Sequence, residues 1–431
     1  MNGLLTRFLL QMRTWAVTIL GTAAVLLPAL ASPTTSWAEG GQRLVTAWSS
    51  ALQAIPQGAQ LPALYSAPKV AGRTIRQIIY PTLDASIARL HVSNAFSREP
   101  LVIREISIGP SAAGAALQAN GAVRVSFAGR SSLTLAPGAE IDSDPVNIAI
   151  SKGSPYAISL YVGAQQRLVA WHRIASQVNY ISTPGNHVAD VSGTAYEKRI
   201  TQYAWLTALS VVAPSANVIA ALGDSITDGM RSSVNRNQRW PDALARRFAT
   251  TNTQQTAVIN LGISGNRLLS DSPCYGEALV KRLDRDLIHQ TGVTSVILLI
   301  GINDINFAAM PARQGLDCDF PHTAPTPNDL INGYRRVIAA VHQAGMRLFL
   351  ATLTPASLPT PREAMRQTVN QWIRLGELSD GVIDFDAALR DPASPSRLRL
   401  AYDSGDHIHP SDAGYAAMAN AVPLATVRRT P

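Results

Sequence analysis

The hydrophobic pattern of this chain divides it into an earlier and a later part. In the earlier part, short segments alternate apolar and polar residues, as at residues 88–93, 123–127 and 158–162. Gly, Pro, Asn and Asp separate these segments. Alternation with a period of two is typical of antiparallel strands with one buried face. We therefore expect a β-sandwich-like domain over residues 42–212.

The later part has short, continuously apolar runs that are rich in Val, Ile and Leu. Such runs are typical of parallel strands that are covered on both faces. They lie at residues 218–222, 258–261, 296–300, 348–353 and 382–385.

Longer amphipathic segments separate these runs and predict helices. One helix is expected to begin at Pro327, with Thr326 as its cap, and another to span residues 361–378. Alternating strands and helices predict an α/β domain with a doubly wound parallel sheet over residues 217–425. A short linker joins it to the β-rich domain.

The first 38 residues have the pattern of a secretory signal peptide. Arg7 and Arg13 precede an uncharged stretch over residues 14–31, and small residues allow cleavage after Ala31 or Ala38. An uncleaved anchor is the alternative, because eighteen uncharged residues are just enough to span a bilayer. We expect cleavage, a secreted or periplasmic location and no stable membrane insertion.

Composition and charge narrow the possible classes of function. Hydrophobic residues make up 46% of the chain and charged residues 15%, which is the composition of a globular protein. The length of 431 residues favours two domains over one. The formal charge is +8, but the basic residues are scattered and form no tract with interleaved aromatics. No nucleic-acid partner is therefore expected.

The chain has two cysteines, Cys274 and Cys318. Both lie in polar stretches that contain Pro or Gly, between the expected regular elements. In an oxidising compartment we predict that they form a disulfide. Two free structural thiols are the alternative.

A candidate nucleophile follows the first apolar run of the later part. Ser225 comes directly after Gly223 and Asp224, at the end of the expected strand. Ligands of a doubly wound sheet bind at the carboxyl ends of its strands, where a serine hydroxyl can meet a base from another loop. On its own this motif is weak, because a surface turn has the same composition.

Two later motifs supply candidate donors for an oxyanion. Gly262 follows the second run, and its backbone N–H can approach a substrate oxygen closely. Asn303 follows the third run and carries a side-chain amide. Together with the backbone N–H of Ser225, these groups predict an oxyanion hole with three donors. Each motif alone also fits an ordinary turn.

A candidate base lies near the C-terminus. Asp406 and His409 are separated by two residues, so the carboxylate can accept the imidazole N–H and fix its tautomer. We expect His409 to be the base and Asp406 to orient it. His407 is only one residue from Asp406 and is expected to point elsewhere.

The blocks around Ser225, Gly262, Asn303 and His409, in this order, resemble those of the SGNH hydrolase superfamily of GDSL-type esterases and lipases. The resemblance covers roughly residues 217–425. It implies a flavodoxin-like sheet, a catalytic triad of Ser225, His409 and Asp406, an acyl-enzyme intermediate and no cofactor. The earlier part is similar to the β-rich module of two-domain bacterial members.

Other functions remain open from the sequence alone. An acyltransferase to a sugar or alcohol has the same triad, and a catalytically inactive carbohydrate-binding protein has the same fold. A metallohydrolase is a further alternative. Its ligands would come from Asp403, Asp406, His407 and His409, with Asp224 or Asp228 as a further ligand.

The expected substrate is a small-molecule or polysaccharide ester, with short acyl groups or acetylated sugars favoured. Residues 267–280 and 305–327 are the expected rim loops of the cleft. The β-rich domain is expected either to bind polysaccharide or to pack against the hydrolase domain. Four aromatic residues are candidates for sugar contacts, namely Tyr156, Tyr161, Trp171 and Tyr180.

Overall fold

The structure is a computed structural model of the whole chain. It describes residues 37–38, 42–57, 63–119, 121–251, 255–308, 310–311 and 322–428. The predicted signal peptide lies outside these residues except for Trp37 and Ala38, so its cleavage stays a prediction. In the described part of the chain, no helix is both long enough and apolar enough to cross a bilayer.

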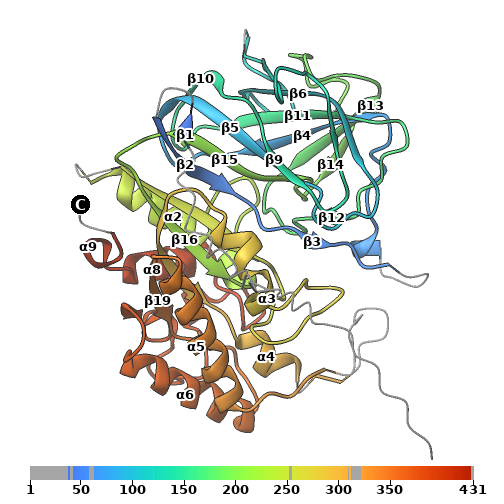
Figure 1. Cartoon of the computed structure of the whole chain (residues 1–431). Coiled ribbons are helices and arrows are strands. Elements are labelled where there is room, and N and C mark those ends of the chain that lie inside the picture. The colour runs from blue at the N-terminus through green and yellow to red at the C-terminus, as the bar shows by residue number, and fades with distance from the viewer. Residues whose placement is uncertain are drawn as a thin grey trace, which may run out of the picture. The chain divides into compact units, whose positions relative to one another are not determined.

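The part of the chain up to Val212, here called the β-rich part, contains two antiparallel sheets among its described residues (Figure 1). The first has the strand order β1-β2-β15-β5-β10, and β9 also pairs with β5. Its strands are β1 (Trp37–Ala38), β2 (Gln42–Ser49), β15 (Leu206–Val212), β5 (Ala85–Ser93), β10 (Val146–Ile150) and β9 (Glu140–Asp142).

The second sheet has the order β14-β13-β4-β11-β6-β7, and β8 also pairs with β6. Its strands are β14 (Lys198–Ile200), β13 (Asn179–Pro184), β4 (Arg73–Ile79), β11 (Tyr156–Val162), β6 (Leu101–Pro110), β7 (Val123–Val125) and β8 (Leu133–Leu135). A short ribbon joins β3 (Gln53–Ala54) to β12 (Ala170–Trp171). The expected β-rich region is confirmed.

Strand β11 shows why the alternating sequence folds in this way. Leu160 lies opposite Ile75 of β4 on one side and Ile106 of β6 on the other, and all three side chains are buried. Aliphatic pairs across neighbouring strands are the stabilising unit of such a sheet.

The four aromatic candidates for sugar contacts are largely buried. Trp171, Tyr156 and Tyr180 are at most 9% exposed, and Tyr161 is half-buried. Their burial favours a packing role over a sugar-stacking role for these side chains.

The part of the chain from Asn217 onward, here called the α/β part, contains a parallel sheet of five described strands in the order β17-β16-β18-β19-β20. The strands are β16 (Asn217–Gly223), β17 (Thr256–Gly262), β18 (Val293–Leu299), β19 (Arg347–Ala351) and β20 (Gly381–Ile383). Each of the five predicted runs overlaps one of these strands. The order is that of a flavodoxin-like doubly wound sheet, whose ligands bind where the strand order reverses.

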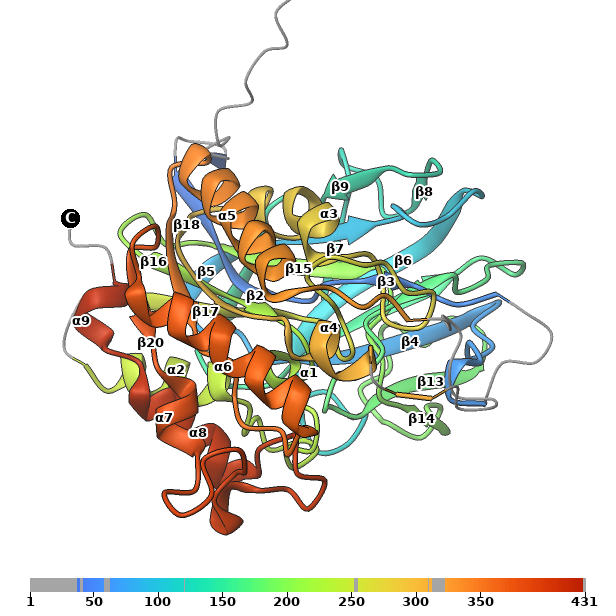
Figure 2. The ribbon, with the colours of Figure 1, turned by 90° about the horizontal axis from the view of Figure 1, so that it is seen from below.

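The larger helices of the α/β part fall into two packed groups. One group contains α2 (Trp240–Ala249), α7 (Phe385–Leu389) and α8 (Asp412–Ala421), and the other contains α3 (Leu279–Leu283), α4 (Ile302–Phe307), α5 (Pro327–Gln343) and α6 (Thr360–Leu375). Figures 1 and 2 both show α5 and α6 side by side. The remaining described helical segments are η1 (Ala63–Tyr65), α1 (Ser225–Asp228), η2 (Asp284–Ile288), η3 (Leu400–Tyr402) and α9 (Leu424–Val427).

The two parts are packed against each other. Buried apolar residues of both parts belong to one hydrophobic core, which runs from Val45 to Val427 along the sequence. The backbone N–H of Thr46 in β2 donates to the carbonyl of Thr291, and the Gln53 side chain donates to the carbonyl of Cys274. The β-rich part is therefore an integral support of the α/β part.

Candidate active site

Ser225 lies at the sharp turn between β16 and α1. Asp224 caps α1 by accepting the N–H of Ile226, and Ser225 is the first helical residue. A side chain on Gly223 would place its Cβ 2.2 Å from the carbonyl oxygen of Leu299, so only glycine fits before this turn. Ser225 is 4% exposed.

A hydrogen-bonded chain joins Ser225 to the C-terminal loop. The Oγ atom of Ser225 lies 2.8 Å from Nε2 of His409, and Nδ1 of the same ring lies 2.8 Å from Oδ2 of Asp406. The backbone N–H groups of Ile408 and His409 donate to Oδ1 of Asp406 at 3.1 and 2.8 Å. These bonds fix the carboxylate, which in turn selects the tautomer in which Nε2 can accept a proton.

The charge on Asp406 is strongly stabilised. Burial raises the pKa of Asp406, but the hydrogen bonds from His409 and from the backbone outweigh burial and hold the pKa well below its usual range. Arg231, which is largely exposed, adds an ion pair with a distance of 3.0 Å from Nε to Oδ2. Asp406 is therefore ionised wherever His409 can act as a base.

Two other carboxyl groups near the turn have a raised pKa, in contrast to Asp406. Burial raises the pKa of Asp224 to about 7, and burial raises that of Asp304 to about 6. Among the described residues, Oδ2 of Asp224 has no hydrogen-bond partner. Asp304 accepts the backbone N–H groups of Leu268 and Leu269.

Gly262 lies beside α1, but its N–H is already used. It donates to Oδ1 of Asn260 at 2.9 Å, and this contact does not support the predicted role of Gly262 as an oxyanion donor. Its lack of a side chain has another cause, since a Cβ would lie 2.3 Å from the backbone nitrogen of Asp228. Gly262 is thus required for the close packing of β17 against α1.

Asn303 is the second residue of α4, two residues after Gly301 and four after Leu299, where β18 ends. It is 8% exposed, and its Nδ2 donates to the carbonyl of Asn266 at 3.0 Å. The amide is therefore held at the turn that contains Gly265, whose φ is +83°. Within the described part of the chain the Gly265 N–H has no hydrogen-bond partner.

His407, the neighbouring histidine, has a different partner. Its Nδ1 lies 2.6 Å from Oδ2 of Asp403, and its side chain is 69% exposed. No group of three or more described His, Cys, Asp or Glu side chains is placed to hold a metal ion.

Sequence reasoning missed His172, a buried residue of the β-rich part. Its Nε2 lies 2.9 Å from Oδ1 of Asp228, the last residue of α1, and its Nδ1 lies 2.9 Å from the carbonyl of Ala51. Burial lowers the pKa of His172, but the charge of Asp228 and the hydrogen bonds outweigh burial and raise it. Asp228 also accepts the N–H and hydroxyl of Ser264. No sequence motif points to this pair.

Arg282 was also missed. Its fully buried guanidinium donates to the carbonyls of Gly223 and Leu261 at 2.9 and 3.1 Å, and forms an ion pair with Asp286 at 3.0 Å. It thus joins the ends of β16 and β17 close to the turn of Ser225. An arginine at helical spacing from an acidic residue is a weak signal, because most such pairs lie on the surface.

Cys274 is fully buried and disulfide-bonded. Cys318 lies outside the described residues, as do residues 312–321 of the second expected rim loop. The Cys274–Cys318 pairing therefore stays a prediction.

The fold and the site together define a class of enzyme. A doubly wound sheet has here a serine at the carboxyl end of its first strand, in contact with a histidine that is itself bonded to an aspartate. This is the arrangement of a hydrolase. Residues 221–417 match the model of the GDSL-like Lipase/Acylhydrolase family. This part of the chain belongs to that family, and the protein is an ester hydrolase.

Solved structures to which the chain is similar include three hydrolases. An alpha/beta hydrolase enzyme from the metagenome of Lake Arreo has 23% identity and a TM-score of 0.37, over 50% of this chain and 95% of that chain. An aryl esterase from M. smegmatis has 17% identity and a TM-score of 0.36, over 49% of this chain and 100% of that chain. A GDSL-like lipase from Bacteroides thetaiotaomicron has 14% identity and a TM-score of 0.33, over 49% of this chain and 87% of that chain. No curated protein matches the chain.

Proposed function

We propose that the protein is a secreted serine esterase that hydrolyses carboxylic esters through an acyl-enzyme. Ser225 attacks the ester carbonyl while Nε2 of His409 takes its proton, and Asp406 stabilises the imidazolium that forms. His409 then returns the proton to the leaving alcohol, and water releases the acid in a second step. The observation that carries this proposal is the pair of 2.8 Å contacts from Ser225 through His409 to Asp406.

The oxyanion hole that we propose differs in one residue from the sequence prediction. The backbone N–H of Ser225 and the side-chain amide of Asn303 remain as donors. Gly265 replaces Gly262, because the Gly262 N–H is bonded to Asn260 and Asn303 lies at the turn of Gly265. Three donors around one oxygen would stabilise the tetrahedral intermediate, each by about 3–4 kcal/mol.

Short acyl esters and acetylated carbohydrates are the substrates that we propose. Short acyl groups are proposed because the sequence after the predicted signal peptide contains no long apolar segment that could form a lid. Secretion is proposed on the signal-peptide pattern of the first 38 residues.

An activity panel tests the proposed function. The purified protein is assayed with p-nitrophenyl esters from acetyl to palmitoyl and with acetylated xylan, and Ser225→Ala serves as the blank. Hydrolysis that favours short chains and disappears in Ser225→Ala is expected. Equal rates for the wild type and Ser225→Ala on every ester would refute the proposal.

A further inference from the structure

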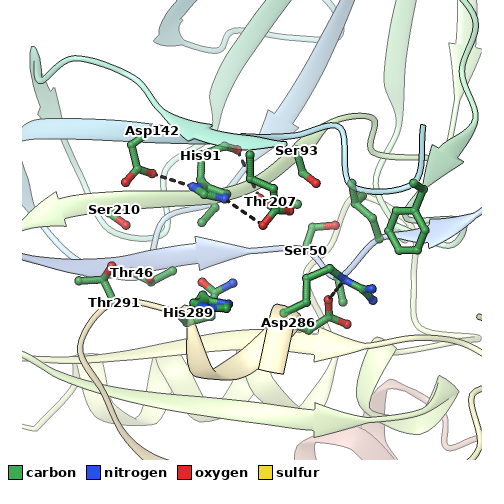
Figure 3. Close-up of a pocket in the computed structure, with 17 residues that line it drawn as sticks. Thr46, Ser50, His91, Ser93, Asp142, Thr207, Ser210, Asp286, His289 and Thr291 are labelled. Carbon is green, nitrogen blue, oxygen red and sulfur yellow. Dashed lines mark hydrogen bonds and ion pairs between the residues drawn. The ribbon is translucent and has the colours of Figure 1, made fainter. Parts of the chain in front are cut away.

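A cavity of about 280 Å³ lies where the β-rich part meets the α/β part (Figure 3). One wall is formed by side chains of β2, β5, β9 and β15, and the other by residues 285–291, just before β18. None of its lining residues belongs to the candidate active site. The cavity is therefore separate from the chemistry described above.

The walls of this cavity are rich in hydroxyl groups. A hydroxyl can both donate and accept a hydrogen bond, so a wall of hydroxyls suits a ligand that does both. The residues that supply these groups are Thr46, Ser50, Ser93, Thr207, Ser210 and Thr291 (Figure 3).

Two buried polar atoms at the cavity have no partner among the described residues. One is Oγ of Ser50, a residue that is 4% exposed, and the other is Oε1 of Gln290. Buried polar groups in folded proteins are nearly always hydrogen-bonded to protein or to solvent. Both residues line the cavity, so rotation of their side chains would bring these atoms to a molecule inside it.

The ionic groups at the cavity are already paired with one another. His91 lies 2.7 Å from Asp142 and 3.7 Å from Glu140, and Asp286 lies between Arg282 at 3.0 Å and Arg285 at 2.9 Å. Burial lowers the pKa of His91, but the bonds to the two carboxylates outweigh burial and raise it to about 9. A charged ligand would compete with these ion pairs, whereas a neutral ligand would leave them intact and could still bond with His289, which forms no ion pair among the described residues.

The size of the cavity limits the ligand further. It falls just below the range of roughly 300–1,000 Å³ that is typical of sites for drug-sized molecules. Leu52 and Phe96 add an apolar portion to the lining. Small size, many hydroxyls and one apolar side are the properties expected of a site for a single sugar ring.

We propose that this cavity binds one neutral monosaccharide unit, free or within a glycan, through the hydroxyl groups of Ser50, Thr207 and Ser210. The site would give the β-rich part a carbohydrate-binding role that does not use its buried aromatic residues. It does not depend on the proposed esterase function, because no group of the cavity takes part in that chemistry.

The test is a titration of full-length Ser225→Ala protein by calorimetry, so that no turnover disturbs the signal. Methyl β-D-xyloside and methyl β-D-glucoside are the neutral probes, and glucuronate is the charged comparison. Saturable binding of a neutral probe in the millimolar range is expected, at least tenfold tighter than binding of glucuronate.

Two variants test whether the binding occurs in this cavity. Ser50→Val and Ser210→Leu are each expected to weaken binding at least tenfold, while Thr134→Val, at the exposed residue of β8 and outside the cavity, is expected to leave it unchanged. Ser210 is only partly buried, so its variant remains informative if Ser50→Val fails to fold. No saturable binding of either neutral probe, preference for glucuronate, or full affinity in Ser210→Leu would overturn the proposal.

Discussion

At the scale of single residues, the proposed chemistry depends on which groups hold charge. Asp406 stays ionised because four N–H donors surround it, two from the backbone and one each from His409 and Arg231. Asp224, one residue before Ser225, is buried with one unpartnered oxygen and takes up a proton readily. The two carboxyls therefore lead to different predictions.

Replacing Asp406 by Asn removes the acceptor that orients His409. We expect kcat on p-nitrophenyl acetate to fall by about 10³–10⁴-fold with little change in KM, because the wrong tautomer is then favoured. His407→Gln is the matched control, since that ring contacts Asp403 and is largely exposed. Loss of activity in the control, or a fall of less than tenfold in Asp406→Asn, would contradict the assigned roles.

Asp224→Asn tests the raised pKa. The folded carboxyl keeps its proton to about pH 7, whereas the unfolded one loses it near the ordinary pKa of 3.8. The unfolded state therefore binds fewer protons in this range, and the wild type loses stability as pH rises, by up to about 1.4 kcal/mol per pH unit. The variant lacks this slope, so the difference between the two should grow in favour of Asn.

Urea unfolding at several pH values between 4 and 8 measures this difference. Asp329→Asn is the control, because hydrogen bonds within the cap of α5 lower the pKa of Asp329 from 3.8, so its contribution changes mainly below the measured pH range. Parallel pH profiles for the wild type and Asp224→Asn would show that the Asp224 pKa is not raised.

The residues of the site could be predicted only in part. The order and spacing of the motifs predicted four site residues, because each follows a strand or precedes a helix at the expected edge of the sheet. These residues are Ser225, Asn303, Asp406 and His409. The direction of one N–H group could not be predicted, and Gly262 was assigned a role that its bond to Asn260 does not support. Such a bond depends on tertiary packing and cannot be predicted from the residues of the motif.

At the scale of elements, the helices follow their sequence signals closely. Thr326 caps α5 by accepting the N–H of Asp329, whose carboxylate accepts the N–H of Thr326 in return. Helix α6 ends at Leu375, three residues earlier than predicted, because Gly376 adopts a left-handed conformation with φ +66°. Glycine is the residue that most readily ends a helix in this way.

Thr326→Ala is expected to destabilise the protein by about 1 kcal/mol, through loss of the cap and its reciprocal bond. Thermal unfolding measures the change, and activity should persist because α5 carries no residue of the site. Thr368→Ala, on the exposed face of α6, is the control and should be neutral or slightly stabilising. Equal destabilisation by both changes would argue against capping as the cause.

At the scale of the whole molecule, the β-rich part supports the active site directly. The ion pair from His172 to Asp228 reaches the helix that begins with Ser225, and Asp228 also holds Ser264 in the turn beside Gly265. The change from alternating to continuous apolar pattern predicted both parts of the fold. The sequence could not predict their contact, because a lone histidine more than 50 residues from the nucleophile carries no signal.

His172→Gln should lower both stability and kcat, because it leaves the buried Asp228 carboxylate without its ion-pair partner. A double-mutant cycle with Asp228→Asn is expected to show strong coupling in urea unfolding and in kcat. His187→Gln is the matched control, since its partner Asp190 lies at a similar distance of 2.8 Å but away from the site. Additive effects in the cycle would show that the pair does not position the helix.

The central claim is that Ser225 is a nucleophile activated by His409. The most direct measurement is the mass of the intact protein after reaction with a fluorophosphonate, followed by peptide mapping of the modified residue. A single adduct on Ser225 is predicted, with labelling abolished in Ser225→Ala and slowed by several orders of magnitude in His409→Ala. An unmodified wild type, or an adduct on any other residue, would contradict the account.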